Sequence, residues 1–234
     1  MLRRLAAAAA VTLVFAPAVR AQDLSAICAR AIHPPVGAWS EYRMVGGHED
    51  GSTFRFSIVG KASRGGTPYL WVEAEMHGLK AGPGNGRPMT FISKALVPDL
   101  DHGLGRASER IVKIGDQPAM EMPAEQSHVA PTPGSDILSG CRSAKVVGWE
   151  HVTVPAGSFR ALHVKDANGN GDTWVDPDLP LAVVKTTARG GESSSELTAH
   201  GTGARSRITG KPRPWDPMAF RMMMMGAAGA GPGR

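Results

Sequence analysis

The sequence predicts a mainly β protein whose strands pair mostly in antiparallel fashion. Short runs rich in Val, Ile, Phe, Tyr and Trp alternate with clusters of Gly, Pro and Asn, at intervals typical of β-sandwiches and barrels. Within the run Thr53–Val59, the apolar residues Phe54, Phe56 and Ile58 alternate with polar residues. This period of two is that of a half-buried strand in an antiparallel sheet. One short N-terminal helix is the only helical element that we expect.

The first 21 residues have the pattern of a secretory signal peptide. Arg3 and Arg4 precede an apolar run from Leu5 to Val14, and Val19-Arg20-Ala21 forms the exit to a cleavage site. This order of charge, short apolar core and small residues marks a signal peptide. The apolar run is also too short to span a bilayer, which takes about 20 residues. We therefore expect cleavage after Ala21 and a mature protein that is periplasmic or secreted and does not span the membrane.

The chain after the cleavage site divides into a domain and a tail. Residues 22–215 suit a single antiparallel β domain, since domains commonly hold roughly 100–200 residues. Residues 216–234 include Met222-Met223-Met224-Met225, followed by Gly, Ala and Pro. We expect this Met/Gly-rich tail to be disordered, because it has no periodicity and little bulk to pack.

The charge pattern argues against nucleic acid as a partner. The full chain has a formal net charge of +5, but Arg3, Arg4 and Arg20 leave with the signal peptide. The remaining Lys and Arg residues are scattered along the chain, whereas a nucleic-acid-binding surface gathers them on one face.

The individual elements follow from local patterns. A helix is expected at Asp23–Ile32, where apolar residues recur with helical spacing at Leu24, Ile27, Cys28 and Ala31. Strands are expected at Gly37–Val45, Thr53–Gly60, Tyr69–His77, Met89–Leu96, Ser108–Ile114, Ala144–Val154, Phe159–Asp166, Asp172–Asp176, Leu181–Thr187 and Ser193–His200. Irregular connections are expected at Leu79–Pro88 and Pro123–Ser139, because Gly and Pro interrupt regular structure there.

The cysteines predict a disulfide bond. Cys28 and Cys141 are the two cysteines of the chain, and an even count in an oxidising compartment indicates pairing. The bond would join the N-terminal segment to the middle of the chain. A redox or metal-binding pair is the alternative, but the C-x-x-C spacing of redox sites is missing from the sequence.

Three motifs follow one another in the second half. Val154-Pro155-Ala156-Gly157-Ser158-Phe159 is a strand, a turn and a strand; Trp174-Val175-Asp176-Pro177 comes next, and then Pro180-Leu181-Ala182-Val183-Val184-Lys185. This order resembles poorly characterised exported bacterial proteins that look like relatives of the periplasmic lipoprotein carriers, the lipoprotein-localisation-factor superfamily. The resemblance covers Val146–His200, and the earlier strands match only in general pattern. It implies that the sheet is strongly curved and forms an incomplete barrel around an apolar cavity.

The motifs also have purely structural explanations. Pro155 and Gly157 have the chemistry of a tight turn, and the large ring of Trp174 buries well in a core. Two functions therefore stay open. The resemblance implies a non-enzymatic protein that binds a lipid or acyl chain in its cavity, while a filled core would indicate a structural or interaction protein of the cell envelope.

The candidate ligand-binding residues are apolar side chains of the predicted strands. Small-molecule sites are concave and mostly apolar, and the candidates are Phe54, Phe56, Ile58, Trp71, Phe91 and Trp174. In Tyr69–Met76, alternation places Trp71 on one face with Glu73 and Glu75, so that this face either lines a groove or meets solvent.

One motif resembles a metal site. Asp166-Ala167-Asn168-Gly169-Asn170-Gly171-Asp172 matches the first half of a calcium-binding loop, but Pro177 stands where a bidentate Glu belongs. Asn-Gly pairs between β runs favour a hairpin instead. The run Met222–Met225 offers soft ligands for Cu(I), although four adjacent Met residues are not the usual spacing of a copper site.

Catalytic motifs are missing from the sequence. Ser158 follows Gly157 without the G-x-S-x-G pattern of a nucleophile elbow, and the Gly pairs at residues 103–105 and 201–203 do not lie in a βαβ unit, as a nucleotide loop would. The sequence therefore predicts neither an enzyme nor a cofactor.

Overall fold

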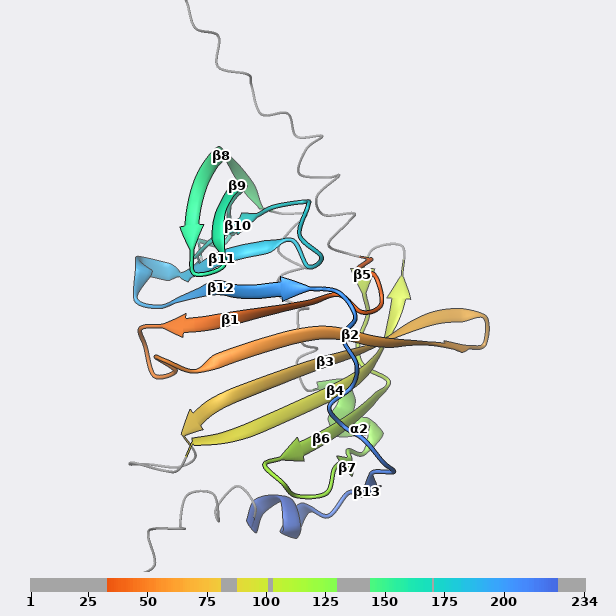
Figure 1. Ribbon diagram of the computed structural model, residues 1–234. Coiled ribbons are helices and arrows are strands. Elements are labelled where there is room, and N and C mark those ends of the chain that lie inside the picture. The colour runs from red at the N-terminus through yellow and green to blue at the C-terminus, as the bar shows by residue number, and fades with distance from the viewer. Residues whose placement is uncertain (1–32, 81–87, 101–102, 130–143, 170, 223–234) are drawn as a thin grey trace, which may run out of the picture.

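The structure is a computed structural model, and it describes residues 33–80, 88–100, 103–129, 144–169 and 171–222 (Figure 1). The expected signal peptide, the expected helix at Asp23–Ile32 and both cysteines lie outside these residues. The described helices lie elsewhere, at α2 (Ala124–Val129) and at residues 217–222. The structure therefore does not support the predicted N-terminal helix.

The described chain forms one large sheet of short and long strands. The strands are β1 (Trp39–Val45), β2 (Thr53–Arg64), β3 (Thr67–Lys80), β4 (Pro88–Leu100), β5 (Gly103–Leu104), β6 (Glu109–Ile114), β7 (Met120–Glu121), β8 (Lys145–Val154), β9 (Gly157–Lys165), β10 (Gly171–Val175), β11 (Val183–Ala188), β12 (Ser194–Gly201) and β13 (Arg213–Pro214). Every strand expected from the sequence is present.

The sheet is open and mixed. Its order is β13-β7-β6-β4-β3-β2-β1-β12-β11-β10-β9-β8, with β5 added to β4. All pairs are antiparallel except β13 with β7, which is parallel, so the sheet is mostly antiparallel, as predicted, and mixed at this edge. The reason is the path of the chain, which crosses the sheet after β12 and reaches β7 running in the same direction.

The register of β1, β2 and β3 defines the two faces of the sheet. Phe54 lies opposite Tyr42 and Met76, and directly opposed residues of antiparallel strands share a face. We call this side the cavity face. Arg55 lies opposite Glu41 and Glu75 on the other side, which we call the strap face.

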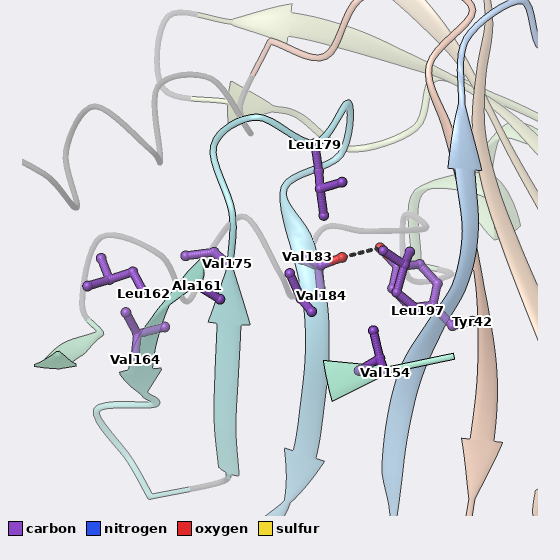
Figure 2. Packing of buried hydrophobic residues seen from close by; sticks show 10 residues of the cluster. All are labelled: Tyr42, Val154, Ala161, Leu162, Val164, Val175, Leu179, Val183, Val184 and Leu197. Carbon is purple, nitrogen blue, oxygen red and sulfur yellow. Dashed lines mark hydrogen bonds between the residues drawn. The ribbon is translucent and has the colours of Figure 1, made fainter. Parts of the chain in front are cut away.

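The first hydrophobic cluster lies where β8–β11 curl toward β1 and β12. Its buried members are Tyr42, Val154, Ala161, Leu162, Val164, Val175, Leu179, Val183, Val184 and Leu197 (Figure 2). The turn between β8 and β9 reaches β12, because the Ala156 amide donates to the Leu197 carbonyl at 3.0 Å. The curl therefore folds one end of the sheet over its own cavity face.

The second hydrophobic cluster lies mainly on β2, β3 and β4, with one residue from before β1 and one from before β6. Its buried members are Ala38, Phe56, Ile58, Leu70, Val72, Ala95, Val97 and Ala107. Ile58 and Val72 are fully buried and directly opposed. Burial of such β-branched side chains contributes about 1.5–3 kcal/mol each, so this cluster stabilises the central strands.

A segment after β12 crosses the strap face. Residues 202–212, which we call the C-terminal strap, run over β2, β3 and β4 toward β7 (Figure 1). Glu73 anchors the strap: its carboxylate accepts hydrogen bonds from the Ser206 hydroxyl at 2.6 Å and from the Arg207 amide at 2.8 Å. The Arg207 guanidinium also lies 3.7 Å from Glu75. Glu73 is only 3% exposed.

The chain after Trp215 is partly regular. Residues 217–222 are helical, whereas the sequence predicted disorder from residue 216 onward. The Asp216 carboxylate accepts hydrogen bonds from the Met218 and Ala219 amides, which is the N-cap arrangement that starts a helix. Residues 223–234 lie outside the described part of the chain.

We predict that Glu73→Ala releases the strap. The Ser206 hydroxyl and the part-buried Arg207 amide lose their charged acceptor, and a hydrogen bond to a charged group contributes about 1.5–3 kcal/mol. Urea unfolding should show a loss of this size, and trypsin should cut at Arg205 and Arg207 faster. Glu121→Ala, which removes an exposed carboxylate from β7, three strands away from β3 in the sheet, is the control. Equal cleavage rates for the two variants would contradict the anchoring role of Glu73.

Candidate functional site

A cavity of about 270 Å³ lies on the cavity face between β1–β3 and β11–β12. The residues that line it are Tyr42, Met44, Glu49, Ser52, Thr53, Phe54, Met76, Leu79, Val183, Thr186 and Ser195. Tyr42, Phe54 and Met76 form one row across three adjacent strands, and Thr186 pairs with Ser195 on the facing strands. The curl of the sheet brings these two walls together.

Tyr42 fixes the inner end of the cavity. Its phenol hydroxyl donates to the Val183 carbonyl at 3.1 Å (Figure 2), although β12 lies between β1 and β11 in the sheet. Tyr42 is 5% exposed. Burial raises its pKa well above the usual range, and a contact with Ser40 opposes this in part. The phenol therefore stays neutral and acts as a hydrogen-bond donor.

Most of the hydroxyl groups around the cavity are satisfied within the protein. The Thr186 and Ser195 hydroxyls lie 2.7 Å apart and bond to each other, and the Ser52 hydroxyl donates to the Glu49 carbonyl at 2.6 Å. Buried polar groups that are already paired present little demand for water or ligand. Tyr42, Phe54, Met76 and Val183 therefore give the cavity a mainly apolar wall.

The one charged side chain that lines the cavity in the described structure lies at its rim. Among the described residues that line the cavity, Glu49 alone carries a charge at neutral pH. It is exposed and lies in the turn between β1 and β2, next to Asp50, whose carboxylate accepts a hydrogen bond from the Gly46 amide at 2.8 Å. The mouth of the cavity is therefore acidic.

A buried arginine lies elsewhere on the cavity face. Arg110 pairs with Ala95, is 5% exposed, and donates to the Ser93 hydroxyl at 2.9 Å. Burial lowers the pKa of its guanidinium, because a charged group is penalised in an apolar environment. Arg110 does not line the cavity, so it leaves the acidic character of the mouth unchanged.

Of the predicted ligand-binding residues, Phe54 alone lines the cavity. Phe56 and Ile58 share its face but pack in the second hydrophobic cluster, where they are 9% and 0% exposed. Phe91 also lies on this face, because it is opposite Met76 on β3 and Ile114 on β6. It is separated from the cavity by β3.

The structure places both predicted tryptophans on the strap face. Trp71 lies two residues from Glu73 on β3, and the Lys94 ammonium lies 4.9 Å above its ring. Trp174 is opposite His163 and Lys185, stacks on the His163 ring at 4.5 Å, and donates to Glu150. Trp174 packs against the first hydrophobic cluster, as Phe54 does, but neither indole lines the cavity, so the six predicted residues do not form one site.

Sequence reasoning missed most of the lining residues. Tyr42, Met44, Thr186 and Ser195 all lie on predicted strands, and the alternation in β1 could have placed Tyr42 on an inner face. The site also depends on how β1 pairs with β12 and on the pairing of Thr186 with Ser195. The register between separate strands of this kind cannot be predicted from one sequence.

A polar network lies around His163 on the strap face. Its Nδ1 is 3.0 Å from Glu150 and its Nε2 is 2.6 Å from Asp172, while Lys165 lies 3.6 Å from the same Asp172. The two carboxylates contact opposite edges of the ring and do not converge on one point. Within the described residues there is no group of three His, Cys, Asp or Glu that could hold a metal ion.

The segment predicted as a hairpin or a calcium loop forms a hairpin. β9 and β10 pair in antiparallel fashion on either side of it. The Asp166 carboxylate accepts a hydrogen bond from the Asn168 amide at 2.7 Å, as in an Asx turn, and Gly169 has a positive φ of 73°. Local turn chemistry therefore accounts for Asp166 and Gly169.

The comparisons with known proteins give no family. No family model matches the sequence, and no curated protein matches it. In the described part of the chain, no helix is long and apolar enough to cross a membrane.

Three solved structures are similar at low scores. A candidate exported protein with a YmcC-like fold from Bacteroides fragilis NCTC 9343 is 10% identical, covers 72% of this chain and 97% of its own, and has a TM-score of 0.32. A candidate lipoprotein from Parabacteroides distasonis ATCC 8503 is 9% identical over 73% of this chain and 98% of its own, with a TM-score of 0.33. MucB is 15% identical over 82% and 62%, with a TM-score of 0.31. Similarities at this level do not define the function of this chain.

We predict that the buried phenol of Tyr42 makes the protein less stable at alkaline pH. Above about pH 10 the unfolded chain loses the phenol proton while the folded chain keeps it, so the free energy of unfolding falls by up to about 1.4 kcal/mol per pH unit. Tyr42→Phe removes this contribution. Urea unfolding from about pH 8 to about pH 11, on both sides of the ordinary tyrosine pKa of about 10, should show the wild type losing stability more steeply than the variant. Parallel curves would contradict a buried, neutral Tyr42.

Proposed function

We propose that this chain is an exported protein of the cell envelope that binds a small hydrophobic ligand in the cavity of its curved sheet. The observation that carries the proposal is the apolar cavity between Tyr42, Phe54 and Val183. Close-packed interiors have few voids larger than a water molecule, so a cavity of this size on a packed face is a candidate binding site.

The volume favours a single short chain. The cavity of about 270 Å³ is slightly below the roughly 300–1,000 Å³ of sites for drug-sized ligands. A lipid with several acyl chains would have to leave most of its surface outside. The ligand is therefore one acyl or alkyl chain, or one chain of a larger lipid.

The charge at the mouth favours a neutral or cationic head group. Glu49 is the charged residue at the rim, and a carboxylate or phosphate placed beside it would be repelled. A hydroxyl or ammonium group would instead donate a hydrogen bond to the Glu49 carboxylate. Exposed charges give modest energies, so we expect a preference among head groups and not an absolute exclusion.

A structural role in the envelope is the second candidate. The close packing of Phe56 and Ile58 in the second cluster favours it, because these residues fill the part of the sheet where a larger cavity was expected. The two roles differ in what happens when the cavity alone is filled.

Export and the disulfide belong to the same proposal. The pattern of residues 1–21 supports export, and an oxidising compartment supports a bond between Cys28 and Cys141. Both lie outside the described residues.

Filling the cavity should weaken ligand binding. We choose Thr186→Phe, because Thr186 lines the cavity, and we expect it to weaken binding of 1-octanol by at least about tenfold, since each methylene kept in water costs about 0.8 kcal/mol. Isothermal titration calorimetry measures the change. Octylammonium should bind at least as well as octanol, and octanoate should bind more weakly.

Thr187→Phe is the matched control. Thr187 is the next residue of β11 and points to the opposite face, so the same substitution there should leave octanol binding unchanged. Equal loss in both variants would indicate damage to β11 and not a filled site. Octanol binding of unchanged strength in Thr186→Phe would contradict this cavity as the site and favour the structural role.

A further inference from the structure

Two methionines near the C-terminal end are the most exposed large apolar side chains of the described chain. Met218 is 71% exposed and Met222 is 65% exposed. They are four residues apart in the helical segment 217–222, and residues with this spacing lie on the same face of a helix. The sequence continues with Met223-Met224-Met225. An exposed apolar stripe of this kind requires an explanation.

The helical segment is held in place from its other side. The Asp216 carboxylate accepts hydrogen bonds from the Met218 amide at 2.9 Å and the Ala219 amide at 3.0 Å, and the Trp215 and Phe220 rings pack at 4.8 Å. The parallel pairing of Arg213 with Met120 joins the segment to the sheet. Met218 and Met222 are therefore presented to solvent by an anchored element.

An open groove of about 710 Å³ runs beside the methionines. Its lining residues are Gln117, Pro118, Met120, Arg213, Pro214, Trp215, Asp216, Pro217, Ala219 and Met222. Met120 is buried at its base. The groove widens the apolar area next to Met222, so that the exposed surface is more than two isolated side chains.

The segment itself carries three exposed positive charges, while the exposed carboxylates of Asp116 and Glu121 lie in the adjoining β6–β7 turn and on β7. Lys211, Arg213 and Arg221 are exposed, and none of them forms an ion pair with another residue in the described part of the chain. Asp216 is the one acidic residue of the segment from 211 to 222, and its carboxylate is engaged in the helix cap.

We propose that residues 211–222 dock on the surface of an anionic lipid bilayer, with Met218 and Met222 inserted among the lipids. Apolar side chains beside Lys and Arg are the combination by which peripheral segments bind at the interface. The positive charges match anionic head groups, whose field falls off within a Debye length of the membrane. The inference is independent of the ligand cavity, which lies at the β1–β2 turn on β1–β3 and β11–β12.

Vesicle co-sedimentation of the mature, full-length protein tests the proposal. Vesicles of phosphatidylglycerol and phosphatidylcholine should bind the protein, and vesicles of phosphatidylcholine alone should bind it much more weakly. The double variant Met218→Ser/Met222→Ser should weaken binding by at least about tenfold, because two apolar side chains no longer insert. Arg213→Glu/Arg221→Glu should weaken binding to the anionic vesicles only, and added salt should do the same to the wild type.

Val147→Ser is the control, because Val147 is an exposed apolar side chain (53%) on β8, far from this segment in the sheet order. It should bind anionic vesicles like the wild type. Equal melting temperatures would show that all variants fold. The proposal is overturned if the wild type does not bind anionic vesicles, or if the double methionine variant binds them equally well. Self-association that the methionine variant abolishes, without any vesicle binding, would instead assign the surface to a second copy of the chain.

Discussion

The buried contact between Tyr42 and Val183 is the constraint on which the shape of this protein depends. It joins β1 to β11 across β12, and it is possible only if the sheet bends enough to bring the two strands over Leu197, which is fully buried beneath them. The bulge in β12 at Thr198, opposite Glu41 and Tyr42 of β1, assists this bend, since bulges increase the local twist. Because the hydrogen bond is buried, losing it would leave the Val183 carbonyl unsatisfied. The bend is therefore stabilised by both packing and hydrogen bonding.

The same bend separates a packed region from a hollow one. On β2–β4, Ile58 and Val72 fill the cavity face completely. Toward the β1–β2 turn, the walls contributed by Phe54 and Thr186 do not meet, and the cavity remains between them. The strap face has the opposite character, because Glu73 and Glu75 bind the C-terminal strap. One sheet thus uses its two faces for different purposes, an apolar recess on one side and a polar anchor for the chain end on the other.

The sequence predicted the strands well and the site poorly, for physical reasons. Alternation and turn residues act over a few positions, so β2 and the hairpin at Asp166 could be recognised locally. The lining of the cavity depends on Tyr42 meeting Val183, which is 141 residues away, and no local pattern encodes that contact. Trp71 and Trp174 were chosen for their apolar rings, yet alternation alone places Trp71 on the same face as Glu73. β7 and β13 have two residues each, and tertiary pairing, not propensity, makes them strands.

Native mass spectrometry of protein purified gently from the periplasm tests the ligand cavity most directly. We expect the folded protein to carry one small adduct per chain, which organic extraction would identify as a single-chain compound with a neutral or cationic head group. The adduct should be missing from Thr186→Phe prepared in the same way. A bare mass for the wild type, two hydrogens lighter than the reduced chain, would support the disulfide between Cys28 and Cys141 but would contradict a bound ligand. The recess beside Tyr42 and Phe54 would then be a packing defect of a structural protein.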